Sequence, residues 1–144
     1  MVAGRKRTSL CFAALLRHRA VLLSSYVNKM SDLFPYHFQN ENVDFFVDIH
    51  AHSTLMNGFM YGNVYDDATR YEKQAVFPKL MCGNADDFSM MNTSFNRDAM
   101  KAGTGRRFLG GILNKNTMCY TLEVSFFCYT LNQGSSIYPY DEDS

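Results

Sequence analysis

The sequence predicts an α/β fold in which helices flank a mixed sheet. Two apolar runs rich in aromatic and β-branched residues, at 45–49 and 118–129, are typical of strands. A third stretch, residues 66–83, begins with two acidic residues and continues with apolar residues at helical spacing. The chain has 144 residues, of which 47% are hydrophobic, so it is long enough for one domain with a packed core.

The first 31 residues contain no acidic side chain and carry six basic ones, with apolar runs between them. Arg17-His18-Arg19 splits the uninterrupted apolar core that a secretory signal needs, so we do not expect secretion. The pattern predicts a helix with one solvated face, and a mitochondrial transit peptide is the alternative. We therefore expect residues 1–40 to form a divergent, basic, helical extension.

Residues 44–62, DFFVDIHAHSTLMNGFMYG, are expected to form a strand, a functional edge, a turn and a second strand. Side chains alternate along a strand, so Asp48, His50 and His52 project to one face. Two imidazoles and a carboxylate at a strand end suit a metal ligand together with a carboxylate that orients it. The alternative is a histidine that is only partly exposed and hydrogen-bonded.

Pro78 interrupts the helical stretch at 66–83, because proline lacks an N–H group and clashes with the preceding turn. We therefore expect a kinked or two-piece helix there. Gly83-Asn84 predicts a left-handed cap at its end. The mixed polar segment 87–104 is predicted to be a strand or loop that crosses the surface.

Residues 103–107, GTGRR, are predicted to be a flexible loop that carries two guanidinium groups. Together with Arg97 and Lys101, Arg106 and Arg107 are opposed only by Asp98, which predicts a local positive patch. The alternative is an ordinary solvated basic turn.

The strand predicted at 118–129, MCYTLEVSFFCY, carries a single carboxylate, Glu123. Alternation places Glu123 on one face with Cys119, Thr121 and Ser125. Glu123 is then either a solvent-facing charge on a half-buried strand or a residue that lines a cleft. The polar tail at 132–144 is expected to be frayed.

The charge balance favours neither nucleic acid nor a membrane surface as a partner. The chain carries 14 basic and 14 acidic residues, and no apolar run approaches the roughly 18 residues that a membrane span needs. Its four cysteines form no C-x-x-C pair. We therefore expect buried thiols in a reducing compartment rather than a zinc ribbon.

Five motifs resemble, in this order and spacing, the zinc metallocarboxypeptidases of the M14 clan: 48–53 (DIHAHS), 59–63 (FMYGN), 77–80 (FPKL), 103–106 (GTGR) and 120–123 (YTLE). Within that clan they resemble the cytosolic carboxypeptidases, the tubulin deglutamylases, and in particular the sixth type. The resemblance implies that residues 41–131 form the C-terminal half of a carboxypeptidase-like domain. It also implies a cytoplasmic, microtubule-associated protein that removes C-terminal or side-chain glutamates from glutamylated tails such as those of tubulin.

The resemblance also assigns roles to individual residues. By position, His50 is one of three zinc ligands, and Glu123 is the general base and proton shuttle. Arg106 is expected to receive the acidic side chain of the residue removed, with Arg107 as the alternative, because a planar guanidinium binds a carboxylate through two hydrogen bonds. In the family, zinc polarises the scissile carbonyl and acidifies a bound water.

The sequence departs from the family pattern in its first part. The H-x-x-E motif that supplies the other two zinc ligands occurs nowhere in the chain, and nothing before Asp44 resembles the Asn-Arg motif that binds the substrate's terminal carboxylate. We therefore expect the C-terminal half of a catalytic domain with an unrelated start, which alone holds no stoichiometric zinc and is inactive.

The sequence is compared with two functions other than that of a metallocarboxypeptidase. A catalytically incomplete pseudo-peptidase that binds acidic peptide tails without cleaving them is the alternative that stays open. A metal-dependent TIM-barrel hydrolase, which also uses a D-x-H-x-H strand, is disfavoured because such a barrel needs about 250 residues. It also takes ligands from later strands, and no histidine follows His52.

Overall fold

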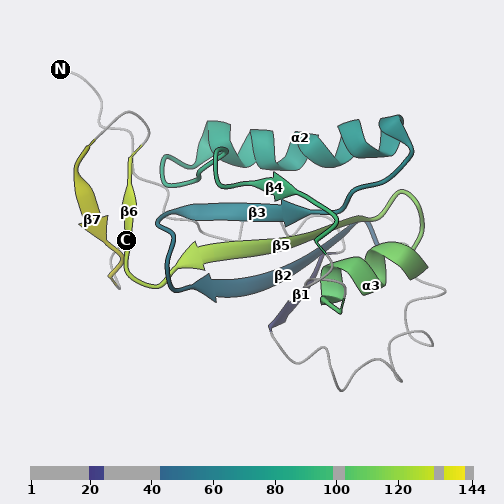
Figure 1. The fold of residues 1–144 in the computed structure, drawn as a ribbon, viewed down its shortest axis with the longest axis horizontal. Coiled ribbons are helices and arrows are strands. Elements are labelled where there is room, and N and C mark those ends of the chain that lie inside the picture. Colours follow the sequence, from purple (N-terminus) through teal and green to yellow (C-terminus); the bar gives the residue numbers. More distant parts are fainter. Residues whose placement is uncertain (1–19, 25–42, 99–102, 132–134, 142–144) are drawn as a thin grey trace.

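The predicted α/β class with a mixed sheet is confirmed by a computed structural model, which describes residues 20–24, 43–98, 103–131 and 135–141 (Figure 1). In the described part of the chain, a five-stranded sheet has the order β1-β2-β5-β3-β4, and β6 and β7 form a separate pair. The elements are β1 (Ala20–Ser24), β2 (Phe45–His52), β3 (Gly58–Gly62), α2 (Ala68–Asn84), β4 (Ser94–Phe95), α3 (Gly105–Ile112), β5 (Met118–Ser125), β6 (Cys128–Thr130) and β7 (Ile137–Pro139).

The central strand, β5, brings together segments that are far apart in the sequence. It runs parallel to β2 on one side and antiparallel to β3 on the other. In the parallel register Asp48 lies opposite Thr121, and His50 lies opposite Glu123. Residues opposite each other on adjacent strands project to the same face, so the predicted alternation and the predicted pairing of these two strands are both confirmed.

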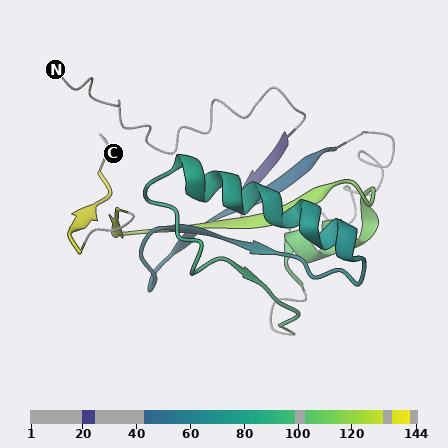
Figure 2. The ribbon, with the colours of Figure 1, turned by 90° about the horizontal axis from the view of Figure 1, so that it is seen from above.

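Helix α2 covers one face of the sheet (Figures 1 and 2). Its inner side packs on a core of buried side chains from the three middle strands and the loop after the helix, which are Val47, Met60, Tyr120, Leu122, Ala85 and Phe88. Helix α3 contacts β5 and β2 instead, and it lies on the other face of the sheet. Alternation therefore places His50 and Glu123 on the face that α3 partly covers.

Of the kinked or two-piece helix expected at 66–83, the two-piece form is wrong, because α2 runs through Pro78 without a break. Asp67 caps its start and accepts hydrogen bonds from the main-chain N–H groups of Thr69 and Arg70. Pro78 removes the donor that would bond Gln74 O. The hydroxyl of Tyr120 on β5 donates to that carbonyl at 2.8 Å, so the buried acceptor is satisfied from outside the helix.

The predicted left-handed cap at Gly83-Asn84 is also wrong. Both residues belong to α2, and no glycine of the described residues has a positive φ. The helix ends instead at Ala85, which is in the extended region with φ −124° and donates its N–H to Met81 O. Ala85 is drawn into the core beside the sheet, so packing decides where this helix ends.

Residues 105–112 form helix α3, so the loop predicted around Arg106 and Arg107 is wrong there. The helix buries Gly105, Arg106, Leu109 and Gly110, which share one side at helical spacing. This periodicity is hidden in the sequence, because two of the four buried residues are glycines and one is charged. The buried side of a helix can therefore include glycine and charged residues as well as hydrophobic ones.

Two further expectations for the ends of the chain need correction. Residues 20–24 form β1, which pairs in parallel with β2, so the helix expected in the N-terminal extension does not include them. The rest of residues 1–40 lies outside the described residues. The tail is not frayed at 137–139, where β7 pairs with β6. No helix of the described residues is long and apolar enough to cross a membrane.

Candidate functional site

His50 and Asp48 lie side by side near the carboxyl end of β2. Asp48 Oδ2 is 2.8 Å from His50 Nε2, although the angles there do not make a hydrogen bond. The Asp48 carboxylate is nearly buried, with 4% of its side chain exposed, whereas 37% of the His50 side chain is exposed. With Nε2 turned toward the carboxylate, Nδ1 is the ring nitrogen that remains for a metal or substrate.

Glu123 lies beside His50 on the same face, as the sequence predicts. Its strand, β5, sets it between His50 on β2 and Phe59 on β3. Glu123 is half-buried and is adjacent in the strand to the fully buried Leu122. A carboxylate and an imidazole therefore converge at one rim of the sheet, a pairing that can move a proton to and from a bound water.

The described residues do not make up a complete metal site. No group of three or more His, Cys, Asp and Glu side chains in this part of the chain is arranged to hold a metal ion. A catalytic zinc needs three protein ligands, and His50 is the one that the sequence predicts. The Asp48 carboxylate has Oδ2 close to His50, and its buried Oδ1 has no hydrogen-bond partner among the described residues. Asp48 therefore fits a residue that orients His50 rather than a second metal ligand.

His52 has a structural task at the turn that follows β2. Its Nδ1 accepts hydrogen bonds from the main-chain N–H groups of Leu55 at 3.0 Å and Thr54 at 3.2 Å. Its ring also packs edge-on against Phe59, with the ring centroids 5.2 Å apart. His52 therefore shapes the loop beside the site, and Nδ1 is not free to bind a metal.

Arg106 lies in the interior, with 1% of its surface exposed, and not on a solvated turn. Nη1 donates to Gly62 O at 2.7 Å and to Asn63 Oδ1 at 2.6 Å, whereas Nε has no partner among the described residues. Burial, and next the nearby charge of Arg107, lowers the pKa of Arg106 to about 10, so the guanidinium stays charged at neutral pH. A charged group is thus held in the interior with part of its hydrogen-bonding capacity unused.

Arg106 and Glu123 are on the same face of the sheet. Arg106 is on the buried side of α3, and α3 packs against β5 and β2 on the face that carries Glu123.

The predicted positive surface patch does not form among the described residues. Arg97 pairs with Asp66. Arg107, the alternative substrate ligand, donates from Nη1 to Asp98 O at 2.5 Å and from Nη2 to Asn96 O at 2.8 Å, which ties α3 to the chain after β4. Lys101 lies outside the described residues. Of the two arginines, Arg106 is the one with a buried donor, Nε, that has no hydrogen-bond partner among the described residues.

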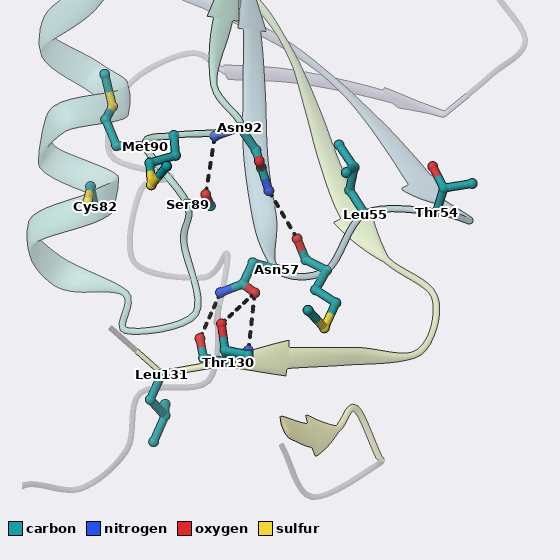
Figure 3. A pocket seen from close by; sticks show the side chains of 11 residues that line it. Thr54, Leu55, Asn57, Cys82, Ser89, Met90, Asn92, Thr130 and Leu131 are labelled. Carbon is teal, nitrogen blue, oxygen red and sulfur yellow. Dashed lines mark hydrogen bonds between the residues drawn. The ribbon is translucent and has the colours of Figure 1, made fainter. Parts of the chain in front are cut away.

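An open groove of about 600 Å³ lies next to the carboxyl ends of β2 and β5 (Figure 3). Its walls carry Leu55, Met56, Met90 and Met91 together with polar side chains such as Asn92. The turn that forms one wall contains Asn57, whose φ of 71° is left-handed and whose amide bonds Thr130 on β6. The groove is uncharged and mostly apolar, and its lining does not include His50 or Glu123.

Comparison with known proteins adds to this geometry. No family model matches the sequence. The chain is similar to human cytosolic carboxypeptidase 6, with 57% identity over 109 residues, which cover 76% of this chain and 22% of the relative. The Caenorhabditis elegans protein of the same name is 47% identical over 87 residues, or 58% of this chain and 18% of the relative. Human cytosolic carboxypeptidase 2 is 31% identical over 140 residues, or 91% of this chain and 15% of the relative.

A solved metallo-carboxypeptidase from Burkholderia cenocepacia has a similar fold, with a TM-score of 0.50 and 19% sequence identity. That match covers 59% of this chain and 22% of the other protein, and at this identity it supports the fold alone. The chain spans about a fifth of the length of the curated relatives that it matches. The chain is therefore a homologue of the cytosolic carboxypeptidases and carries part of a metallocarboxypeptidase fold.

Proposed function

We propose that this chain is part of a zinc metallocarboxypeptidase that removes C-terminal or side-chain glutamates from protein tails such as those of tubulin. The observation that carries the proposal is the parallel register of β2 and β5, which sets His50 beside Glu123 on one face of the sheet. The names of the curated relatives support both a carboxypeptidase and a cytosolic location. Tubulin tails place the protein at microtubules in this proposal.

In this proposal three residues have separate tasks. His50 contributes one ligand to the zinc, whose other ligands come from beyond the described residues. Glu123 takes a proton from water and returns it to the leaving amine, a task worth about 10²–10⁴-fold in rate. Arg106 receives the acidic side chain of the substrate, and its unused Nε–H is the donor available for that carboxylate.

A second candidate function is a pseudo-peptidase that binds acidic tails without cleaving them. The buried, charged Arg106 favours this candidate specifically, because a pocket in which an arginine binds an acidic side chain does not need a metal. Arg106 is 1% exposed, so in either case a carboxylate reaches it only after this part of the chain opens. Zinc stoichiometry separates the two functions only when the other two ligands of the proposed zinc site are present, since the binder needs no zinc.

Arg106→Glu tests directly whether Arg106 binds an acidic side chain of the substrate. The unmutated chain should prefer a peptide ending in glutamate over a matched peptide ending in leucine. The reversed charge should abolish glutamate-peptide binding, measured by calorimetry, and leave any leucine-peptide binding intact. Arg106→Lys is the matched control, because it keeps the charge and loses the planar fork, and it should weaken glutamate binding less. Equal binding of both peptides by the unmutated chain would count against the pocket.

A further inference from the structure

Arg106 is a buried cation that is fixed from one side and unpaired on the other. Nη1 is shared between Gly62 O and Asn63 Oδ1, and Nε has no partner among the described residues. No carboxylate in the described part of the chain forms an ion pair with it. A buried charge in this state is costly unless an anion completes its environment, so the direction of the unpaired edge decides whether a carboxylate can bind.

Asn63 ties the side chain and the main chain of Arg106 together. Its Oδ1 accepts from Arg106 Nη1 at 2.6 Å, and its Nδ2 donates to Arg106 O at 3.0 Å and to Tyr65 Oη at 3.1 Å. One amide thus fixes both ends of the same arginine. The guanidinium cannot rotate about its long side chain without breaking the Oδ1 contact.

The main chain of Asn63 is itself held by Gln74 on α2. Gln74 Nε2 donates to Asn63 O at 2.6 Å, and Asn63 N donates to Gln74 Oε1 at 3.0 Å. Gln74 is fully buried, so both contacts are shielded from water. The position of Asn63 therefore does not depend on its own side chain, which makes the side chain a separable target for mutation.

Gly110 on α3 leaves the space that the Asn63 amide fills. A Cβ atom at Gly110 would lie 2.3 Å from Asn63 Nδ2 and 2.9 Å from Tyr65 Oη, whereas a Cβ atom at Gly111 would meet nothing within 4 Å. The two glycines are neighbours in one helix. The contacts around Asn63 require a small residue at Gly110 but not at Gly111.

We propose that Asn63 is a positioning residue that aims Arg106 at the carboxylate of an acidic substrate residue, and that Gly110 makes room for it. The inference rests on the proposed function, in which Arg106 receives that carboxylate. Asn63 acts through Arg106 and does not itself contact the substrate. Selectivity for acidic peptides then depends on an uncharged amide that belongs to the motif at 59–63 but has no role assigned from the sequence.

The test compares Gly110→Ala and Asn63→Ala with Gly111→Ala in the full 144-residue chain. Calorimetry measures affinity for a peptide ending in glutamate and for a matched peptide ending in leucine. In the first two variants the ratio of the affinities for the glutamate and leucine peptides should fall about tenfold, which is the loss expected from one charge-assisted hydrogen bond. Gly111→Ala should keep the full preference, because its added methyl group meets open space.

A second readout does not depend on any peptide. The Nε–H resonance of Arg106 in ¹⁵N-labelled chain, identified by its loss in Arg106→Lys, reports where the guanidinium sits. It should shift or broaden in Gly110→Ala and Asn63→Ala and stay unchanged in Gly111→Ala. Circular dichroism checks that each variant is folded, and Asn63→Ala keeps the two Gln74 contacts because they involve only its main chain.

The outcomes separate the inference from the proposed function. An unchanged Arg106 resonance in both Gly110→Ala and Asn63→Ala would overturn the inference, whatever the peptides do. A shifted resonance with the glutamate preference intact would show that Asn63 holds Arg106 without setting selectivity, which also overturns it. If the unmutated chain has no glutamate preference, the proposed function fails, and the role of Asn63 in selectivity fails with it.

Discussion

Tyr120 replaces a hydrogen-bond donor that Pro78 removes from helix α2. A proline inside a helix costs about 3 kcal/mol, in part because the carbonyl four residues earlier loses its N–H partner. Here that carbonyl belongs to Gln74, and the Tyr120 hydroxyl donates to it at 2.8 Å. Tyr120 is fully buried, and burial raises the pKa of its hydroxyl well above the usual value, so the donor keeps its proton at neutral pH.

Tyr120→Phe should therefore lower the free energy of unfolding by about 1–3 kcal/mol, the cost of a buried acceptor without a partner. In a Pro78→Ala background, residue 78 has an N–H group that can bond Gln74 O. The same Tyr120→Phe change should then cost less than about 1 kcal/mol. Urea unfolding of the four chains measures this cycle. Additive effects of the two substitutions would show that the hydroxyl does not serve this carbonyl.

The residues of the candidate site were predictable to different degrees. His50 and Glu123 were placed correctly on one face, because strand alternation follows from local sequence and the family motifs gave the pairing. The burial of Arg106 was not predictable, because it depends on Gly62 and Asn63, which are more than forty residues away in the sequence. Asn63 was missed for the same reason. An asparagine next to a glycine ordinarily indicates a turn.

At the scale of elements, strands were easier to predict than helix ends. The strands β2 and β5 carry apolar runs with aromatic and β-branched residues, and β3 carries a short apolar and aromatic run, so their patterns are local. The sequence predicts a loop in place of helix α3, because two glycines and one arginine occupy the buried side of this helix. The end of α2 was misplaced, because Gly83 is a common cap residue that here remains inside the helix while Ala85 enters the core.

Gly83→Ala should stabilise the chain by about 0.5–1 kcal/mol, because alanine loses less conformational entropy than glycine in a helix. An added Cβ at Gly83 meets nothing within 4 Å, and the residue does not have a positive φ. Thermal unfolding measures the change. Destabilisation would indicate a left-handed residue there, since alanine is strained in that conformation.

Gly62→Ala is the control for that substitution. The added Cβ would lie 2.2 Å from the ring of Phe95, so the β4 side chain would have to move. This variant should be less stable than the unmutated chain, although the chemical change is the same. A stabilising effect at both positions would mean that chain entropy, rather than local space, dominates both results.

For the molecule as a whole, the described residues do not form a complete metal site. We predict that the purified chain holds no stoichiometric zinc after dialysis against micromolar metal, because three protein ligands are needed and the described residues do not form such a group. Elemental analysis measures the metal content. One tightly held zinc per chain would contradict this prediction, and loss of that zinc in His50→Ala would identify the ligand.

We also predict that the chain alone releases no glutamate from glutamate-ended peptides. A carboxylate base such as Glu123 supplies about 10²–10⁴-fold, whereas enzymes commonly reach 10⁶-fold or more. A chromatographic assay for free glutamate measures turnover, with Glu123→Gln as the control for contaminating peptidase. Release that is abolished both by Glu123→Gln and by a chelator would show that the chain is sufficient for catalysis.

The central place of β5 in the sheet has a consequence for how the protein is made. Strands β2 and β3 leave the ribosome before β5, yet their common neighbour is residues 118–125, which follow α2 and α3. At about 5–20 residues per second, several seconds pass during which both strands have an unpaired edge. Open strand edges pair with other chains, so nascent chains of this protein should depend on a chaperone until residue 125 has emerged.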